Sequence, residues 1–142
     1  MVDASEWGIG LVVGKSWAAW KLCRGWRAGG RDMGWAETLA VELIVLWIVH
    51  DSHLGHDIIV KIRSINLGVI SAGRQGRSRN PPCNESICRV STCLISTNTI
   101  QYVKSAENRA DPISRGKLGP LDARLDISFE LPSELNQFIV IV

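Results

Sequence analysis

Hydrophobic and polar positions along the chain predict a strand-rich N-terminal part followed by a buried central helix. Residues 34–49 are apolar almost throughout, and they contain neither proline nor any glycine after Gly34. A run that is apolar on nearly all sides is typical of a buried helix. At about 100° per residue, Glu37 shares a side with apolar residues, whereas Glu42 shares the opposite side with Thr38. We therefore expect Glu42 to lie in solvent and Glu37 to point towards the core.

A carboxylate directed at a core needs an explanation, because a buried unpaired charge is costly. Two interpretations of Glu37 stay open. It is either a carboxylate of the capping turn, with the helix phase misjudged, or a metal ligand presented by a central helix.

The residues before this helix predict antiparallel strands. Residues 7–13 are rich in apolar and β-branched side chains and end at the turn signal Gly14-Lys15. Residues 16–21 repeat the strand pattern, so the two segments form a hairpin. We expect a third, irregular strand around Trp26 in residues 22–32. The glycines of the first strand lie within a strand pattern and precede no helix, so they do not predict a phosphate-binding loop.

The residues after the helix predict a mixed α/β arrangement. A strand at 58–64, reached through a helix, should run parallel to its neighbour by a right-handed crossover. Further elements follow in the order helix 66–72, basic loop 74–79, helix from Pro81, strand 99–103 and short helix from Asp111.

Two domain segments are expected. Residues 1–118 form the main domain, and residues 119–142 form an extension that packs on it, because the free apolar end 138–142 would be an aggregation hazard. The simplest role for Asp111, which precedes a proline, is a helix N-cap.

Composition fits a globular protein inside the cell. The 142 residues are 46% hydrophobic and 21% charged, and the net charge of +2 alone does not indicate nucleic-acid binding. The longest apolar run, Leu43–Val49, is far shorter than the roughly 20 residues of a membrane span, and no signal segment follows Met1. We therefore expect an intracellular protein without a membrane partner.

The residues that often bind metals give a weak signal. Three cysteines, spaced by five, turn to different sides of a helix, so free thiols are expected rather than a zinc site. The loop after the central helix carries His53 and His56, for which a solvated loop is a simpler interpretation than a metal site.

Six segments resemble, in one consistent order, the ribonuclease H domain of retroelement polyproteins, especially fungal ones. They are VDAS (2–5), WGIG (7–10), WAETLA (35–40), SINLGVI (64–70), GRSRN (76–80) and ENRADPISR (107–115). Each motif alone is weak, whereas their joint order from Asp3 to about Arg115 is more specific. The resemblance implies a ribonuclease H-like mixed sheet, with three antiparallel strands followed by parallel strands and flanking helices.

The resemblance also implies a chemistry. In that family, four carboxylates hold two Mg²⁺ ions, for which Mn²⁺ can substitute, and the endonuclease hydrolyses the RNA strand of RNA–DNA hybrids. By motif, the first, second and fourth ligands would be Asp3, Glu37 and Asp111. Two ions about 4 Å apart bring four positive charges, which clustered carboxylates can hold. One ion activates a water and the other stabilises the leaving oxygen.

The third ligand position departs from the family pattern, because Ile65 and Asn66 stand where relatives carry Asp-Asn. Asp57 lies about 26 Å further back along an extended strand and cannot substitute. Asn66 brings no charge and points to the other face. Loss of a ligand should weaken metal binding, and Asp3 stands close to the chain start, with less strand before it than relatives have. The carboxylate set is therefore incomplete, and cleavage should be impaired or absent.

Nucleic-acid binding could persist without cleavage. Arg74, Arg77, Arg79 and Lys104 would contact phosphates, with Asn66 nearby; the alternative is a solvated basic loop. The expected function is thus a retroelement-derived ribonuclease H-like domain with impaired or absent cleavage, whose partner is RNA–DNA hybrid or another nucleic acid. Whether reverse transcriptase or integrase was once fused to it stays open. The alternatives are a non-catalytic nucleic-acid-binding module and a transposon relic without selected function.

Overall fold

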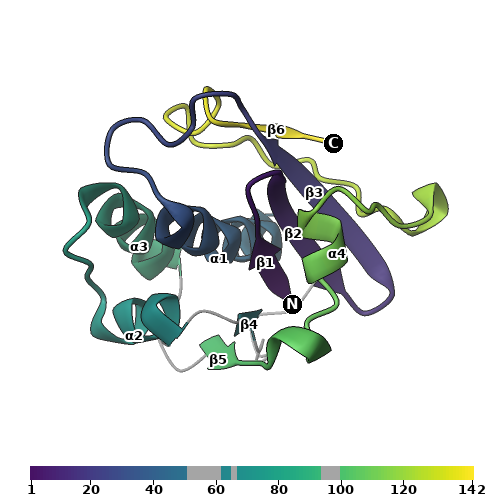
Figure 1. Cartoon of the computed structure of the whole chain (residues 1–142), viewed down its shortest axis with the longest axis horizontal. Helices are drawn as coiled ribbons and strands as arrows, with labels where there is room; N and C mark the ends of the chain where they lie inside the picture. The colour runs from purple at the N-terminus through teal and green to yellow at the C-terminus, as the bar shows by residue number, and fades with distance from the viewer. Residues whose placement is uncertain (51–61, 65–66, 94–99) are drawn as a thin grey trace.

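The computed structural model describes residues 1–50, 62–64, 67–93 and 100–142. Three strands come first, and helices and short strands follow them (Figure 1). The strands are β1 (Val2–Ala4), β2 (Gly8–Val13), β3 (Ser16–Leu22), β4 (Ile62–Ser64), β5 (Ile100–Tyr102) and β6 (Ile139–Ile141). The helices are α1 (Met33–His50), α2 (Leu67–Gln75), α3 (Pro81–Cys93) and α4 (Asp111–Ser114), with single 3-10 turns at Ser105–Glu107 and Leu121–Ala123.

The main sheet has four antiparallel strands in the order β1-β2-β3-β6. The β2–β3 hairpin is confirmed, and Gly14 turns it with a φ of +59°, a value that glycine adopts without strain. The prediction of a third strand in residues 22–32 is wrong, because this segment forms turns. Its Trp26 is buried and stacks on Trp35 of α1 with ring centroids 5.8 Å apart. Apolar content there reflects a packed loop, and β1 and β6 complete the sheet instead.

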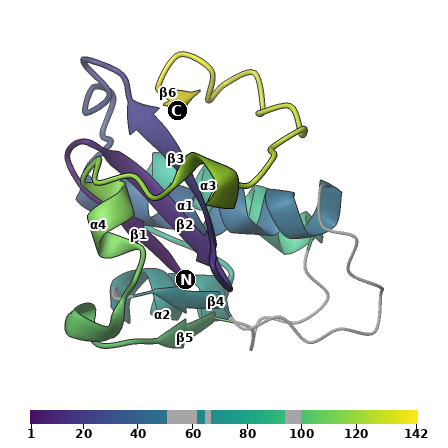
Figure 2. The same ribbon diagram turned by 90° about the vertical axis from the view of Figure 1, so that its right-hand side faces the viewer.

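The predicted buried helix is confirmed as α1, which covers one face of the sheet, while α4 covers the other (Figures 1 and 2). By length and composition α1 could cross a membrane, but 61% of it is buried inside the protein, as in a core helix. The core beneath it joins β-strand residues such as Ile9 and Trp20 to Leu39 and Leu43.

The expected solvent position of Glu42 is wrong, because Glu42 is only 1% exposed and Thr38 only 4%. Helix α3 packs on this side of α1 and supplies the partners of the buried carboxylate. Ser86 donates a hydrogen bond to Glu42, and the Arg89 Nη2 donates another at 3.1 Å. Helical periodicity locates a polar side of a helix, but it cannot tell water from a neighbouring helix with matching polar groups.

Of the remaining elements, β4 lies beside β1 and α3 packs on α1. Strands β4 and β5 pair in parallel as a separate two-stranded sheet, and β4 contacts β1 (Figure 1). Helix α3 begins at Pro81, as predicted, and the side chain of Asn80 caps it by accepting from Cys83 N at 3.1 Å. The described residues therefore form a mixed α/β protein with an antiparallel four-stranded sheet, which confirms the coarse fold class.

The C-terminal residues lie on the main sheet. β6 pairs with β3, and the amide of Leu125 donates to Trp17 O at 2.7 Å. Ile139 is 1% exposed within the α1 side of the core. On the opposite face of the sheet, the Trp17 indole N–H donates to Pro120 O at 2.8 Å.

Candidate functional site

The candidate site is organised around Asp3, a buried carboxylate in the middle of β1. Asp3 is only 4% exposed, so it needs partners inside the protein. The Ser114 hydroxyl donates to Asp3 Oδ2 at 2.6 Å, and Asn108 Nδ2 donates to Oδ1 at 3.3 Å. Both carboxylate oxygens are therefore engaged by groups at or next to α4.

A glycine explains why α4 comes so close to Asp3. Asp3 pairs with Gly10 across β1 and β2. A Cβ at Gly10 would lie 2.6 Å from both Ala110 O and Ser114 N, which is closer than any side chain tolerates. The missing side chain lets the backbone of α4 rest on the sheet beside Asp3.

Polar side chains fix α4 in this position. The Ser5 hydroxyl donates to Ser114 O at 2.6 Å, and Asn108 Nδ2 donates to Val2 O at 3.0 Å. Asn108 Oδ1 accepts from Ala110 N at 3.2 Å. Asn108 and Ser114 are 4% and 0% exposed, so α4 is attached to β1 by a buried hydrogen-bond network.

Asp111 stands at the first position of α4, where its charge reaches Asp3. The N-cap is Ala110 and no side chain caps the helix, so the expected N-cap role of Asp111 is wrong. Its carboxylate accepts from Arg115 Nε at 3.0 Å instead. Burial raises the pKa of Asp3, and the negative charge of Asp111 raises it further, while the Ser114 hydrogen bond and Arg115 oppose the rise.

The second predicted ligand, Glu37, lies on α1, which covers the face of the sheet opposite to α4. It is partly exposed and has one carboxylate oxygen, Oε2, that is buried. No three Asp, Glu, His or Cys side chains of the described residues lie close enough together to hold a metal ion. The structure thus brings Asp3 near Asp111 and does not place Glu37 with them in a metal-holding group.

The donor set as it stands does not fit a pair of divalent ions. Mg²⁺ requires several carboxylate or water oxygens in near-octahedral geometry. Asp3 uses both of its oxygens for Asn108 and Ser114, and Asp111 is paired with Arg115. An ion at Asp3 would have to displace these internal partners.

Other predicted site residues lie outside this cluster or outside the described residues. The substituted position Ile65, together with Asn66 and the histidines at 53 and 56, belongs to residues that the structure does not describe. Four basic side chains are exposed and have no ion-pair partner within the described ranges: Arg74, Arg77, Arg79 and Lys104. They come from α2, the loop after it and the residues after β5, and α2 contacts β5. The four cysteines are free, as expected.

Sequence reasoning missed Asn108 and Ser114 as partners of Asp3. Both lie in the segment 107–115 that resembles the family, but spacing alone gave no reason to connect a serine near residue 114 with an aspartate near the chain start. The contact spans 111 positions and depends on Gly10.

Compared with protein-family models, curated proteins and solved structures, the chain gives no significant match in any of the three.

Proposed function

We propose that this protein is a retroelement-derived ribonuclease H-like domain whose cleavage of RNA–DNA hybrids is impaired or absent. The observation that carries the proposal is the meeting of Asp3 and Asp111 where β1 touches α4. These residues occupy the first and fourth positions of the motif order that resembles the family. The assignment of the chain to this family rests on the sequence motifs and is part of the proposal.

The arrangement of the strands supports the same family. An antiparallel β1-β2-β3 unit is followed by a core helix, and then by β4, which contacts β1 and pairs in parallel with β5. A ribonuclease H-like order would place β4 and β5 beside β1, as an extension of the main sheet. The finer topology is therefore part of this proposal.

Impairment follows from the chemistry of the residues present. Asp3 and Asp111 have internal partners, Ile65 replaces the expected third carboxylate, and Glu37 is not grouped with the other two. Two-metal hydrolysis needs clustered oxygen ligands, which these residues do not provide as they stand. The residues that remain can hold the β1–α4 junction together and present basic side chains to a nucleic acid.

The test is cleavage of a labelled RNA–DNA hybrid in Mg²⁺ and separately in Mn²⁺. The unaltered chain should show no turnover above background or only slow turnover, and Ile65→Asp should raise the turnover because it restores the missing carboxylate. Ile65→Asn is the matched control, because it adds polarity without charge. Rapid Mg²⁺-dependent cleavage by the unaltered chain would contradict the proposed impairment.

A second function, a non-catalytic nucleic-acid-binding module, is favoured by one observation. Arg74, Arg77, Arg79 and Lys104 are exposed and unpaired within the described residues, and free guanidinium groups suit phosphate contacts. Hybrid binding should weaken steeply with salt and survive neutralisation of the three carboxylates.

The binding experiment has a matched control on the same molecule. Replacing the three arginines by glutamine should reduce both the affinity and its salt dependence, because each phosphate contact contributes to the salt slope. Arg24→Gln removes an equally exposed arginine from the loop after β3 and should leave binding unchanged. No binding at low salt, or an equal effect of Arg24→Gln, would exclude the module.

A further inference from the structure

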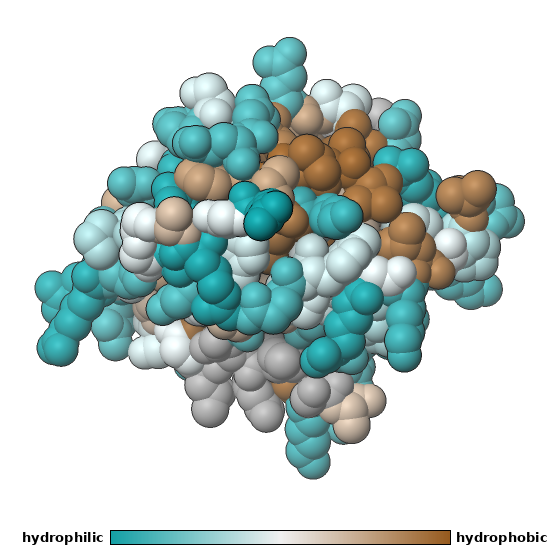
Figure 3. Space-filling view, turned by 45° about the horizontal axis from the view of Figure 1, so that its top comes forward, coloured by the Kyte–Doolittle hydropathy of each residue, from teal (hydrophilic) through white to brown (hydrophobic). Residues whose placement is uncertain are grey.

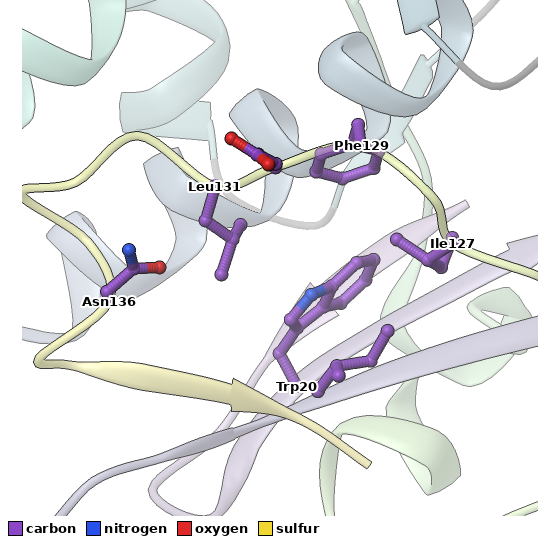
Figure 4. A pocket seen from close by; sticks show the side chains of 7 residues that line it. Trp20, Ile127, Phe129, Leu131 and Asn136 are labelled. Carbon is purple, nitrogen blue, oxygen red and sulfur yellow. The ribbon is translucent and has the colours of Figure 1, made fainter.

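The C-terminal residues build an apolar groove on the side of the main sheet that α1 covers. An extended segment, residues 124–131, crosses this side above β3, and we call it the strap. Its alternate residues, which are Leu125, Ile127, Phe129 and Leu131, pack inwards against the core. Between the strap, Trp20 of β3 and Ile141 of β6 lies a groove of about 320 Å³ (Figure 4).

The groove has the composition of a binding site for a large apolar side chain. Its lining is aromatic and aliphatic apart from Glu130 and Asn136. Figure 4 shows Trp20 on the sheet side, with Phe129 and Leu131 on the strap opposite. The volume is at the small end of the roughly 300–1,000 Å³ of ligand pockets, so it suits one side chain rather than an extended ligand.

The backbone of β6 lies open along the same groove. β6 is the last strand of the main sheet and pairs only with β3 among the described residues. The amide of Val142 donates to Ala19 O, and the amide of Cys23 donates to Phe138 O. The backbone groups of Phe138 and Val142 thus point to β3. Because these groups alternate in direction along an antiparallel strand, those of Ile141 face the open edge.

This edge carries neither the charged residues nor the prolines that often block strand addition. Sheet edges are usually protected by charged residues or prolines, whereas β6 consists of three aliphatic residues. Val140 and Ile141 are 48% and 45% exposed. Figure 3 shows a hydrophobic area with hydrophilic residues around it on the side of the molecule that carries β6.

Charge selects the kind of partner. The last 24 residues hold four acidic side chains and a single basic one, although basic residues are in excess over the whole chain. All four acidic residues are exposed, and Glu130 lines the groove itself. A second copy pairing through β6 would bring two acidic straps together, which is unfavourable.

We propose that the β6 edge and the groove bind an extended segment of a partner protein in which a large apolar residue is flanked by basic residues. The segment adds to the sheet as a strand next to β6. The partner residue opposite Ile141 shares its side of the sheet, so its side chain enters the groove. Basic residues two positions away lie on the same side and reach Glu130.

The probe is the fluorescein-labelled peptide acetyl-Thr-Lys-Thr-Trp-Thr-Lys-Thr-amide, whose lysines and tryptophan share one side of a strand. Its binding to the full chain is measured by fluorescence anisotropy at low salt. A peptide with glutamate in both lysine positions should bind at least about tenfold more weakly, since like charges across an interface oppose association. In an antiparallel pairing the residue opposite Ile141 donates its own amide to the ladder, so a peptide N-methylated at the tryptophan should also lose affinity.

Charge exchange provides the decisive control. Glu130→Lys should weaken binding of the lysine peptide and strengthen binding of the glutamate peptide. Asp122→Lys makes the same charge change at an exposed residue outside the groove lining, and it should change the binding of neither peptide. Binding should also shift the amide resonance of Ile141 in a ¹⁵N-labelled sample. The proposal is overturned if the two peptides bind equally, if neither binds, or if sedimentation shows that a second copy occupies the edge.

Discussion

Ser114→Ala tests whether Asp3 is held charged inside the protein by α4. The hydroxyl of Ser114 donates to Asp3 Oδ2 at 2.6 Å, and both residues are nearly inaccessible to water. Removing the hydroxyl leaves a buried carboxylate oxygen without this donor. A hydrogen bond to a charged group contributes about 2 kcal/mol, so the free energy of unfolding at pH 7 should fall by that amount.

The size of the loss should depend on pH in a defined direction. Folding raises the pKa of Asp3, so the folded protein holds the Asp3 proton more tightly than the unfolded chain does. The contribution of Asp3 to stability is therefore fully present below its ordinary pKa and is lost as the pH rises through the raised value. Ser114→Ala removes a contact that lowers this pKa, so the raised value moves further up. The loss should be about 1 kcal/mol when Asp3 is protonated and about 2 kcal/mol at pH 7.

Urea unfolding followed by tryptophan fluorescence at pH 4 and pH 7 measures both values, since the chain contains six tryptophans. At pH 7 the melting temperature should fall by about 6 °C. Ser5→Ala is the control, because the Ser5 hydroxyl has only uncharged partners: it donates to Ser114 O at 2.6 Å and accepts from Trp7 N at 3.1 Å. Its loss should be about 1 kcal/mol at both pH values. Equal, pH-independent losses for the two variants would refute a buried charged Asp3.

Three further outcomes are expected. Glu42→Gln should destabilise the protein by about 2 kcal/mol in urea unfolding, less than for a fully enclosed pair because Arg89 is 27% exposed. Gly10→Ala should cost about 3 kcal/mol and displace α4, since the new Cβ would lie 2.6 Å from Ala110 O, and hydrogen exchange of the α4 amides should accelerate. Addition of 10 mM MgCl₂ should leave the melting temperature within about 1 °C, because stabilisation by a ligand requires a site that is populated at that concentration.

Each outcome has a comparison that could contradict it. Glu6→Gln breaks an exposed pair with Arg27, and its unfolding midpoint should not move, so an equal effect for Glu42→Gln would deny burial of that pair. Gly34→Ala in the first turn of α1 places the new Cβ 3.2 Å from Asp32 Oδ1, a side-chain atom and not backbone, and should cost less than Gly10→Ala. A magnesium-dependent rise of several degrees, absent in Asp3→Asn, would show a metal site at Asp3.

Local patterns fixed several elements because their causes are local. The hairpin of β2 and β3 follows from two β-rich runs around Gly14, whose positive φ suits glycine. Helix α1 follows from a long apolar run without helix breakers, and α3 begins at the proline where a helix start was expected. In each case the residues that form the element also provide the signal.

Contacts between distant residues decided what the sequence could not. The position of α3 decided whether the polar side of α1 faces solvent or protein. Helix α3 brings Ser86 and Arg89 to the buried Glu42. The completion of the sheet by β1 and β6 depended on backbone pairing, which three-residue strands hardly encode. Motif order singled out Asp3 and Asp111, but the structure added Asn108 and Ser114, because only folding brings α4 over Gly10. Periodicity describes one segment at a time, whereas burial and charge pairing depend on which segment packs against it.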